Sequence, residues 1–320
     1  MERKGRKIAV LGTGNVGATI AYSLTLSGVC SEVVLVDINK TKAEGEALDL
    51  AQCAACVPSV KIRCGEYEDV AGSDLVIVTF GIGRKPDQTR LDLAKVNIGI
   101  LKSVMPSVAK IAPDALYIIV SNPVDLLTYE TIKCTGLPVN RVIGTGTLLD
   151  SSRLVKFVAD YCKVDAHNVC AYVLGEHGDA CMTPWSLCTV AGMKMNDYAQ
   201  KFLNVSEQDI KTEQENIFTD MVKSGAAVIK AKGATFYAIA ASVLHLVKAI
   251  LYNTHSIMTL STLVDGIYGA KDMCVGVPCM VGANGLERVL ELPLSKEEQA
   301  VLDQKIASLS ATYDALELRK

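Results

Sequence analysis

The first half of the chain alternates between short apolar runs and longer stretches with helical periodicity. The apolar, β-rich runs lie at residues 7–11, 33–36, 75–79 and 117–120. The helical patterns between them cover residues 16–26, 41–55 and 91–111. Strands that are apolar throughout and alternate with helices are typical of a parallel sheet covered on both faces. The pattern therefore predicts a doubly wound α/β fold for this half.

The pattern changes near residue 145. Later apolar runs predict strands, which we expect to be antiparallel, at residues 163–174, 186–195, 256–263 and 273–281. Long helices are predicted at residues 206–230, 235–251 and 295–316. We therefore expect a first domain over residues 1–145, built on the parallel sheet. A second, mixed α+β domain is expected over residues 146–320.

The composition argues against several classes of protein. Half of the 320 residues are hydrophobic, 21% are charged and the net charge is −3, which argues against a nucleic-acid-binding protein with its basic face. The apolar stretches are interrupted before the roughly 18 residues that a membrane span requires. Eleven scattered cysteines, an odd number, favour a reducing, cytoplasmic location. The CxxC pair Cys53 and Cys56 has no second pair to complete a metal site, so no metal is expected.

A glycine-rich turn follows the first predicted strand and opens the first predicted helix. It reads Gly12-Thr13-Gly14-Asn15-Val16-Gly17, a GxGxxG pattern. Such glycines permit a tight turn and let backbone N–H groups approach a pyrophosphate at a helix N-terminus. Asp37 stands twenty residues beyond Gly17, at the end of the next strand. Its carboxylate can accept hydrogen bonds from a ribose diol and would repel a 2′-phosphate, which favours NAD over NADP.

One of the four histidines has a sequence context that indicates chemistry. His177 lies in Gly175-Glu176-His177-Gly178-Asp179, where the glycines permit close approach of a ligand. His245 lies in an apolar helical run and is expected to pack in the core, whereas His167 and His255 are expected at the surface.

Other polar residues are expected to converge on His177. Asp150 and Arg153 are one helical turn apart, on one face of a helix. The segments at residues 84–90 and 121–125 each follow a predicted strand. Ligands bind beyond the carboxyl ends of strands in open α/β sheets, so we expect these groups to form one site.

Taken together, these motifs resemble the lactate/malate dehydrogenase family over nearly the whole chain. They are the glycine fingerprint, TRLDL, SNPVD, LDSSR and GEHGD, in that order. Within that family, the chain is most similar to bacterial L-lactate enzymes of the clostridial type. The resemblance implies an NAD-binding Rossmann domain over residues 1–145 and a substrate domain over residues 146–320. It also implies an NAD-dependent oxidoreductase for a small 2-keto or 2-hydroxy acid, active in cytoplasmic glycolysis or fermentation as a homodimer or homotetramer.

The resemblance also implies a role for each site residue. His177 donates and accepts the proton, and Asp150 holds its imidazole. Arg90 polarises the substrate carbonyl and Arg153 clamps the substrate carboxylate, while Asn122 bonds the carbonyl or the nicotinamide. The positions that contact the cofactor are Gly12, Gly14, Asn15, Val16, Gly17, Asp37, Lys42, Tyr67, Gly81, Ile82, Ser103, Val120, Asn122 and Thr145.

The substrate is where the sequence signals conflict. Arg84 falls at the loop position that reads the third carbon of the substrate, where lactate enzymes commonly carry glutamine and malate enzymes arginine. Thr235 matches the lactate-type residue on the other side. We predict an L-lactate dehydrogenase, with malate dehydrogenase as the alternative. A non-catalytic NAD-binding protein is the remote alternative, because His177, Asp150, Arg90 and Arg153 are all present. Phe80 stands where the family usually has alanine, and the sequence offers no physical account of it.

Overall fold

The computed structural model describes residues 6–83, 89–178 and 180–319, with the side chain of Arg90 left out. The predicted substrate residue Arg84 lies outside the described residues. The parallel strands are β1 (Lys7–Leu11), β2 (Glu32–Val36), β3 (Lys61–Cys64), β4 (Leu75–Val78), β5 (Leu116–Ile119) and β6 (Val142–Gly144). They lie in the order β3-β2-β1-β4-β5-β6, which is the strand order of dinucleotide-binding sheets. The predicted doubly wound sheet is confirmed.

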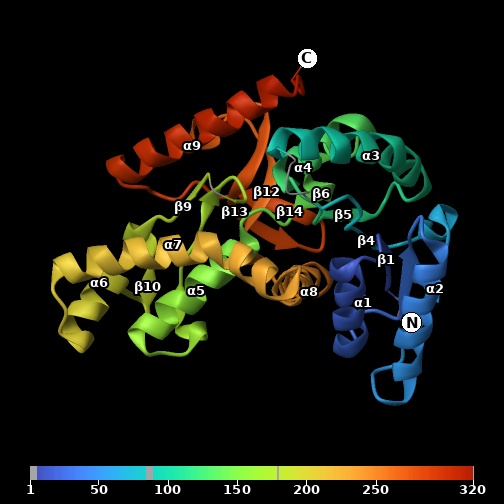
Figure 1. The fold of residues 1–320 in the computed structure, drawn as a ribbon, viewed down its shortest axis with the longest axis horizontal. Helices are drawn as coiled ribbons and strands as arrows, with labels where there is room; N and C mark the ends of the chain where they lie inside the picture. Colours follow the sequence, from blue (N-terminus) through green and yellow to red (C-terminus); the bar gives the residue numbers. More distant parts are fainter. Residues whose placement is uncertain (1–5, 84–88, 179, 320) are drawn as a thin grey trace.

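The helices of the first half connect these strands. They are α1 (Asn15–Ser27), α2 (Lys40–Ala51), α3 (Arg90–Ile111) and α4 (Val124–Thr135). The α3 helix begins with a capping box between Thr89 and Asp92, which satisfies two backbone donors at its first turn. In space, α3 packs against α4, and α1 packs against α8 (Tyr237–Leu251) from the second half (Figure 1). The two halves of the chain therefore share helix contacts as well as a sheet.

The main sheet continues without a break into the second half. Strand β12 (Ser256–Val264) pairs antiparallel with β6, with Ser261 opposite Gly144. A Cβ at Gly144 would lie 2.8 Å from the Cβ of Ser261, so glycine is what allows this approach. Beyond β12 follow β13 (Met273–Gly282), β8 (Leu174–Gly175) and β9 (Cys181–Met182), while β14 (Gly285–Val289) pairs with β13. The predicted strands at residues 256–263 and 273–281 are confirmed, as is their antiparallel pairing.

The strands predicted at residues 163–174 and 186–195 are confirmed only in part, since they pair antiparallel but are much shorter than expected. Only two-residue strands form there, β7 (Val169–Cys170), β10 (Thr189–Val190) and β11 (Met193–Lys194), and they make a small separate sheet. The apolar residues of these segments instead fill a second core against α5 (Leu148–Cys162) and α7 (Glu207–Lys232). Burial of side chains, rather than strand length, explains why these segments are apolar.

The long helices of the second half are confirmed. They are α7, α8 and α9 (Lys296–Ala315), and the short α6 (Met195–Tyr198) leads into a π-helical turn. Figure 1 shows α9 above β12 and β13, with α5, α6 and α7 gathered at the lower left. Among the described residues, no helix is both long and apolar enough to cross a membrane.

Candidate active site

The glycine turn between β1 and α1 has the shape of a phosphate cradle. Gly12 has a φ of +96°, and a Cβ there would lie 2.7 Å from the backbone nitrogen of Phe80. A Cβ at Gly17 would lie 1.9 Å from the carbonyl oxygen of Gly12, so helix and strand can pack this closely only with glycine. Gly14, at the N-cap of α1, faces open space. The backbone is therefore exposed to a ligand where a pyrophosphate would lie, at the positive end of the helix dipole.

Asp37 is fixed beside this turn at the end of β2. Its Oδ2 accepts hydrogen bonds from the backbone N–H (2.6 Å) and hydroxyl (3.0 Å) of Thr13, and its Oδ1 accepts from the N–H of Asn39 (2.8 Å). Burial raises the pKa of Asp37, but these hydrogen bonds and the charge of Lys42 outweigh it and lower the pKa overall. Tyr67 is half-buried nearby, and burial together with the charge of Asp37 raises the pKa of its phenol. The residues expected at the adenosine end of a dinucleotide site therefore lie together beside the glycine turn.

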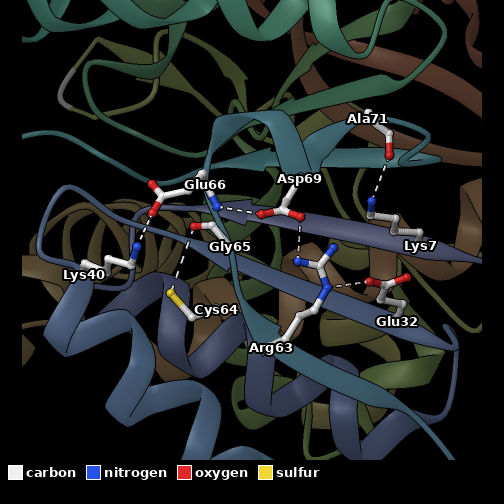
Figure 2. Close-up of polar contacts among 9 residues, drawn as sticks. All are labelled: Lys7, Glu32, Lys40, Arg63, Cys64, Gly65, Glu66, Asp69 and Ala71. Atoms are coloured by element: carbon white, nitrogen blue, oxygen red, sulfur yellow. Dashed lines mark hydrogen bonds and ion pairs between the residues drawn. The ribbon is translucent and has the colours of Figure 1, made fainter.

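A polar cluster holds the backbone next to Tyr67, and Figure 2 shows its members. We call Arg63, Glu32 and Asp69 the Arg63 network. The Arg63 guanidinium bonds Glu32 Oε1 through Nε (2.9 Å) and Asp69 Oδ1 through Nη1 (2.8 Å). Asp69 Oδ2 in turn accepts the backbone N–H of Glu66 (2.8 Å), which caps the turn at Tyr67–Val70. Glu66 also forms an exposed ion pair with Lys40, next to this turn.

A cavity of about 310 Å³ lies beyond the glycine turn, where the nicotinamide end of a dinucleotide would reach. Its lining includes the predicted residues Val16, Gly81, Ile82, Val120 and Asn122. Phe80 also lines it, half-buried against the main core, while its carbonyl oxygen accepts the Ser121 hydroxyl (2.6 Å). The aromatic ring at this position therefore packs as part of the cavity wall.

His177 occupies the loop after β8 and is held by a buried carboxylate. Its ring nitrogen Nδ1 lies 2.6 Å from Asp150 Oδ2, and Arg153 Nη1 donates to Asp150 Oδ1 at 3.2 Å. We call these three residues the His177 network. The flanking Gly175 and Gly178 have φ of +102° and +129°, a backbone conformation that side chains with a Cβ rarely adopt. A Cβ at Gly225 of α7 would lie 3.6 Å from Arg153 Nη2, so this helix passes close to the guanidinium.

The pKa values of this network favour an ionised couple. Burial raises the pKa of Asp150, but the charges and hydrogen bonds of His177 and Arg153 lower it below its usual value. Burial likewise lowers the pKa of His177, and the charge and hydrogen bond of Asp150, with the charge of Asp125, raise it overall. The protonated ring of His177 and the ionised carboxylate of Asp150 therefore stabilise each other.

The His177 ring opens onto a second cavity of about 820 Å³. Asn122 lines this cavity as well as the first one, so the two predicted ligand regions meet at this side chain. The rest of the wall comes from the start of α3, the start of α4, residues 176–178 and Ala180, Ile229 of α7 and polar residues of α9. The arrangement places the His177 imidazole, held by Asp150, in the wall of a cavity that adjoins the predicted nicotinamide pocket.

Comparison with known proteins agrees with this arrangement. The family model for the NAD-binding domain of lactate/malate dehydrogenases matches residues 6–144, and the model for the α/β C-terminal domain of the same family matches residues 147–317. The chain belongs to the lactate/malate dehydrogenase family. Members of the family bind NAD in the half of the chain that carries the glycine cradle and Asp37.

Curated and solved members of the family are similar over almost their full length. L-lactate dehydrogenase 1 of Clostridium acetobutylicum is 43% identical over 314 residues, 98% of this chain and 99% of that protein. An L-lactate dehydrogenase of Clostridium botulinum (strain Hall) is 45% identical over 313 residues, 98% of each. The crystal structure of the minor L-lactate dehydrogenase of Enterococcus mundtii matches with a TM-score of 0.92 and 38% identity, covering 99% of each chain. These relatives are lactate enzymes, so the malate alternative is not favoured.

Several residues that the family resemblance implied lie apart from the two cavities. Ser103 is exposed on α3, with its hydroxyl bonded to the carbonyl of Ile100, and Thr145 is buried after β6. Thr235 is half-buried between α7 and α8. His245, expected in the core, lies instead on the exposed face of α8, because the apolar residues around it take the buried face.

The sequence analysis missed residues that support the site from distant segments. Asn97 of α3 accepts the N–H of Ile82 (2.9 Å) and donates to the carbonyl of Asn122 (2.7 Å), so it ties two loops of the nicotinamide cavity together. Asp125 and Ser261 form a second attachment beneath His177. Asp125 lies in the SNPVD segment that the sequence analysis expected at the site, but its contacts were not predicted. No local pattern marks Asn97 or Ser261, because each bonds to a segment at least fifteen positions away.

Proposed function

We propose that this chain catalyses the reversible, NADH-dependent reduction of pyruvate to L-lactate. The observation that carries the proposal is the His177 network beside a cavity that adjoins the nicotinamide pocket. A 2-keto acid needs its carboxylate bound, its carbonyl polarised and a proton delivered to the carbonyl oxygen. The family's signature residues supply a group for each need.

The residues act as follows in this proposal. Arg153 binds the substrate carboxylate through its planar, two-pronged guanidinium. Arg90 and Asn122 stabilise the negative charge that develops on the carbonyl oxygen. His177 gives its ring proton to that oxygen during reduction and takes it back during oxidation, a contribution of about 10²–10⁴-fold. Asp150 keeps the ring oriented and stabilises the imidazolium that precedes transfer.

The chain fits NAD as the cofactor, which supplies the hydride when bound. The open backbone at Gly14 receives the pyrophosphate, and Asp37 receives the adenosine ribose. Val16, Gly81, Ile82, Val120 and Asn122 line the cavity that would take the nicotinamide end, and Lys42 and Tyr67 would flank the adenosine end. The carboxylate of Asp37 would repel the 2′-phosphate of NADP, so NAD is favoured over NADP.

The choice of pyruvate is tested by comparing two substrates. We expect kcat/KM with pyruvate to exceed that with oxaloacetate when both are measured with NADH. Arg84 should still give measurable oxaloacetate activity, because a charge-assisted hydrogen bond to the second carboxylate is worth about 1.5–3 kcal/mol. Arg84→Gln should therefore lower oxaloacetate efficiency at least about tenfold and spare pyruvate. A wild-type preference for oxaloacetate would overturn the lactate assignment.

We further propose a cytoplasmic homodimer or homotetramer, with an NAD-binding domain over residues 1–145 and a substrate domain over residues 146–320. Family membership supports this arrangement. Large apolar side chains that are exposed on the single chain, among them Leu48 (64%) and Tyr237 (68%), are consistent with burial against another copy. Light scattering coupled to size-exclusion chromatography measures the mass directly, and a monomer at micromolar concentration would contradict the proposal.

A further inference from the structure

A second buried carboxylate lies beneath His177, on the main-chain side of the residue. Asp125, in the first turn of α4, is 2% exposed. Its Oδ2 accepts the backbone N–H of His177 at 2.9 Å, and its Oδ1 accepts the hydroxyl of Ser261 at 2.5 Å. Asp150 holds the ring, and Asp125 holds the backbone from which the ring projects. The loop that carries the acid/base is therefore attached at two points.

The attachment joins three distant parts of the fold. Asp125 lies in the first turn of α4, His177 in the loop after β8 and Ser261 in β12. The hydroxyl of Tyr313 on α9 lies 3.2 Å from the carbonyl oxygen of Asp125, so the C-terminal helix closes over the same point. Gly144 leaves the space in which Ser261 reaches the carboxylate.

The charges around the ring balance when the ring is protonated. Two carboxylates, Asp125 and Asp150, and one guanidinium, Arg153, leave a net charge of about −1 that an imidazolium on His177 cancels. The helix dipole at the start of α4 favours a negative charge on Asp125. We propose that Asp125 is a positioning residue for the acid/base: it fixes the main chain of His177 and, as an ionised carboxylate, favours the protonated ring. This inference rests on the proposed role of His177 as the proton donor.

Other charged groups surround the site in the described part of the chain. Asp150 of α5 contacts the ring, Asp125 of α4 contacts the main chain of His177, and Arg153 of α5 contacts Asp150. Glu176 of the same loop and Lys305 of α9 line the cavity. Burial, together with the charge of Asp150, raises the pKa of Asp125 overall, and the hydrogen bonds from Ser261 and His177 and the charge on His177 offset part of that rise in favour of the ionised form. The charge of Asp125 acts on His177 in the same direction as that of Asp150.

The variant Asp125→Asn separates charge from attachment. Its carbonyl oxygen can still accept the N–H of His177, and its amide can donate to the Ser261 oxygen. We expect the falling alkaline limb of kcat/KM for pyruvate reduction to move to lower pH by about 0.5–2 units. This range is the pKa shift that removal of one unit charge about 6 Å from the ring would cause. Its lower end applies to the dielectric constant of water and its upper end to that near a protein surface. The plateau rate below that limb should stay within about threefold of wild type, because the attachment is kept.

The variant Asp125→Ala removes the attachment as well. We expect the alkaline fall of kcat/KM to move to lower pH by the same amount. In addition, the plateau kcat should be at least about tenfold lower, because a small displacement of a catalytic group lowers the rate by up to ~10²-fold. Ser261→Ala should shift the limb less than Asp125→Asn does, because the carboxylate stays in place. Thermal unfolding and NADH binding report whether each variant is folded.

Glu130→Gln is the matched control. Glu130 is also a buried carboxylate of α4 (5% exposed), but it pairs with Lys102 at 3.1 Å and not with the His177 loop. Its removal should leave the pH profile in place even if the melting temperature falls. The inference would be overturned if Asp125→Asn left the alkaline fall of kcat/KM at the wild-type pH. It would also be overturned if Glu130→Gln moved that fall by as much as Asp125→Asn does.

A measurement without turnover separates this inference from the proposed function. NMR of protein with isotope-labelled histidine follows the titration of the His177 ring directly. A lower ring pKa in Asp125→Asn supports the role of Asp125 even if His177→Asn retains activity, a result that would count against the proposed function alone. An unchanged ring pKa overturns the inference even if lactate dehydrogenase activity is intact.

Discussion

The Arg63 network and the His177 network pair carboxylates with cations in similar geometry, but they differ in burial. Side chains of the Arg63 network keep 24–37% of their surface exposed, and those of the His177 network 7–25%. Pairs in contact with water stabilise a fold by about 0–1 kcal/mol, because solvent screens them. Pairs that are shielded from water act more strongly on each other and shift pKa values. Burial, rather than the number of ion pairs, thus separates a network that holds a backbone from one that prepares a proton.

The largest effect is expected in the buried network. His177→Asn removes the proton donor, so kcat for pyruvate reduction should fall by about 10²–10⁴-fold while NADH still binds. Steady-state kinetics and a fluorescence titration with NADH measure the two effects. His167→Asn is the control, because His167 is exposed and paired with Asp165, and it should keep the wild-type rate. A near-normal rate in His177→Asn would remove this residue from the mechanism.

The same network sets the pH dependence. The pKa of His177 is raised, and reduction needs the protonated ring, so kcat/KM for pyruvate should be full below that pKa and fall as pH rises through it. Lactate oxidation needs the neutral ring and should gain over the same range. Asp150→Asn should move both transitions to lower pH, since the carboxylate is the main cause of the rise. Transitions that stay in place would mean that another group titrates.

An intermediate effect is expected at Asp37, which lies half-buried between the exposed and buried extremes. Asp37→Ala removes the charge that repels a 2′-phosphate, so the ratio of NADH to NADPH efficiency should fall by about tenfold or more. Initial rates with each cofactor give the ratio. Asp49→Ala, an exposed carboxylate on α2, changes the net charge equally and should leave the ratio unchanged. Equal wild-type efficiency with both cofactors would contradict the assignment of Asp37.

The smallest effect is expected in the exposed network. Arg63→Gln should lower the free energy of unfolding by about 1 kcal/mol or less and raise KM for NADH a few-fold, because the turn that carries Tyr67 loses its support. The value of kcat should not change. Lys40→Gln is the control, since the Lys40–Glu66 pair is about 60% exposed on both sides and should contribute less still. A lower kcat in Arg63→Gln would contradict the claim that only the buried His177 network affects the chemical step.

The sequence predicted the parallel sheet well because its strands are buried on both faces. Runs such as Leu75–Val78 contain no polar position and are too short for a helix, so their type follows from pattern and length. The segments at residues 163–174 and 186–195 mix apolar residues with polar ones such as Asp165 and Lys194, and their buried apolar residues serve a core with α5 and α7. An apolar run does not by itself tell whether the partner is a strand or a helix, and there the predicted strands were too long.

The residues of the candidate site likewise fall into those that a local pattern marks and those that only the fold brings together. Residues in short motifs, such as Gly12 and His177, were found because turn glycines mark the chain locally. Asn97 and Ser261 were missed, and Asp125 was placed at the site without a role, because all three act through hydrogen bonds to segments far along the chain. Ser261 lies 136 positions from the carboxylate it contacts, a separation at which only the folded topology specifies a pair.

The junction of β6 with β12 has a consequence for anyone who wishes to divide or recombine this enzyme. A chain cut near residue 145 would leave β6 with an unpaired edge, a surface that invites aggregation. The two fragments would be expected to regain activity only when mixed and refolded together. Consider chimeras that join the N-terminal half of one relative to the C-terminal half of another. They should fold where the residue opposite Ser261 is glycine, as Gly144 is here. They should fail where a side chain at that position prevents β6 from pairing with β12.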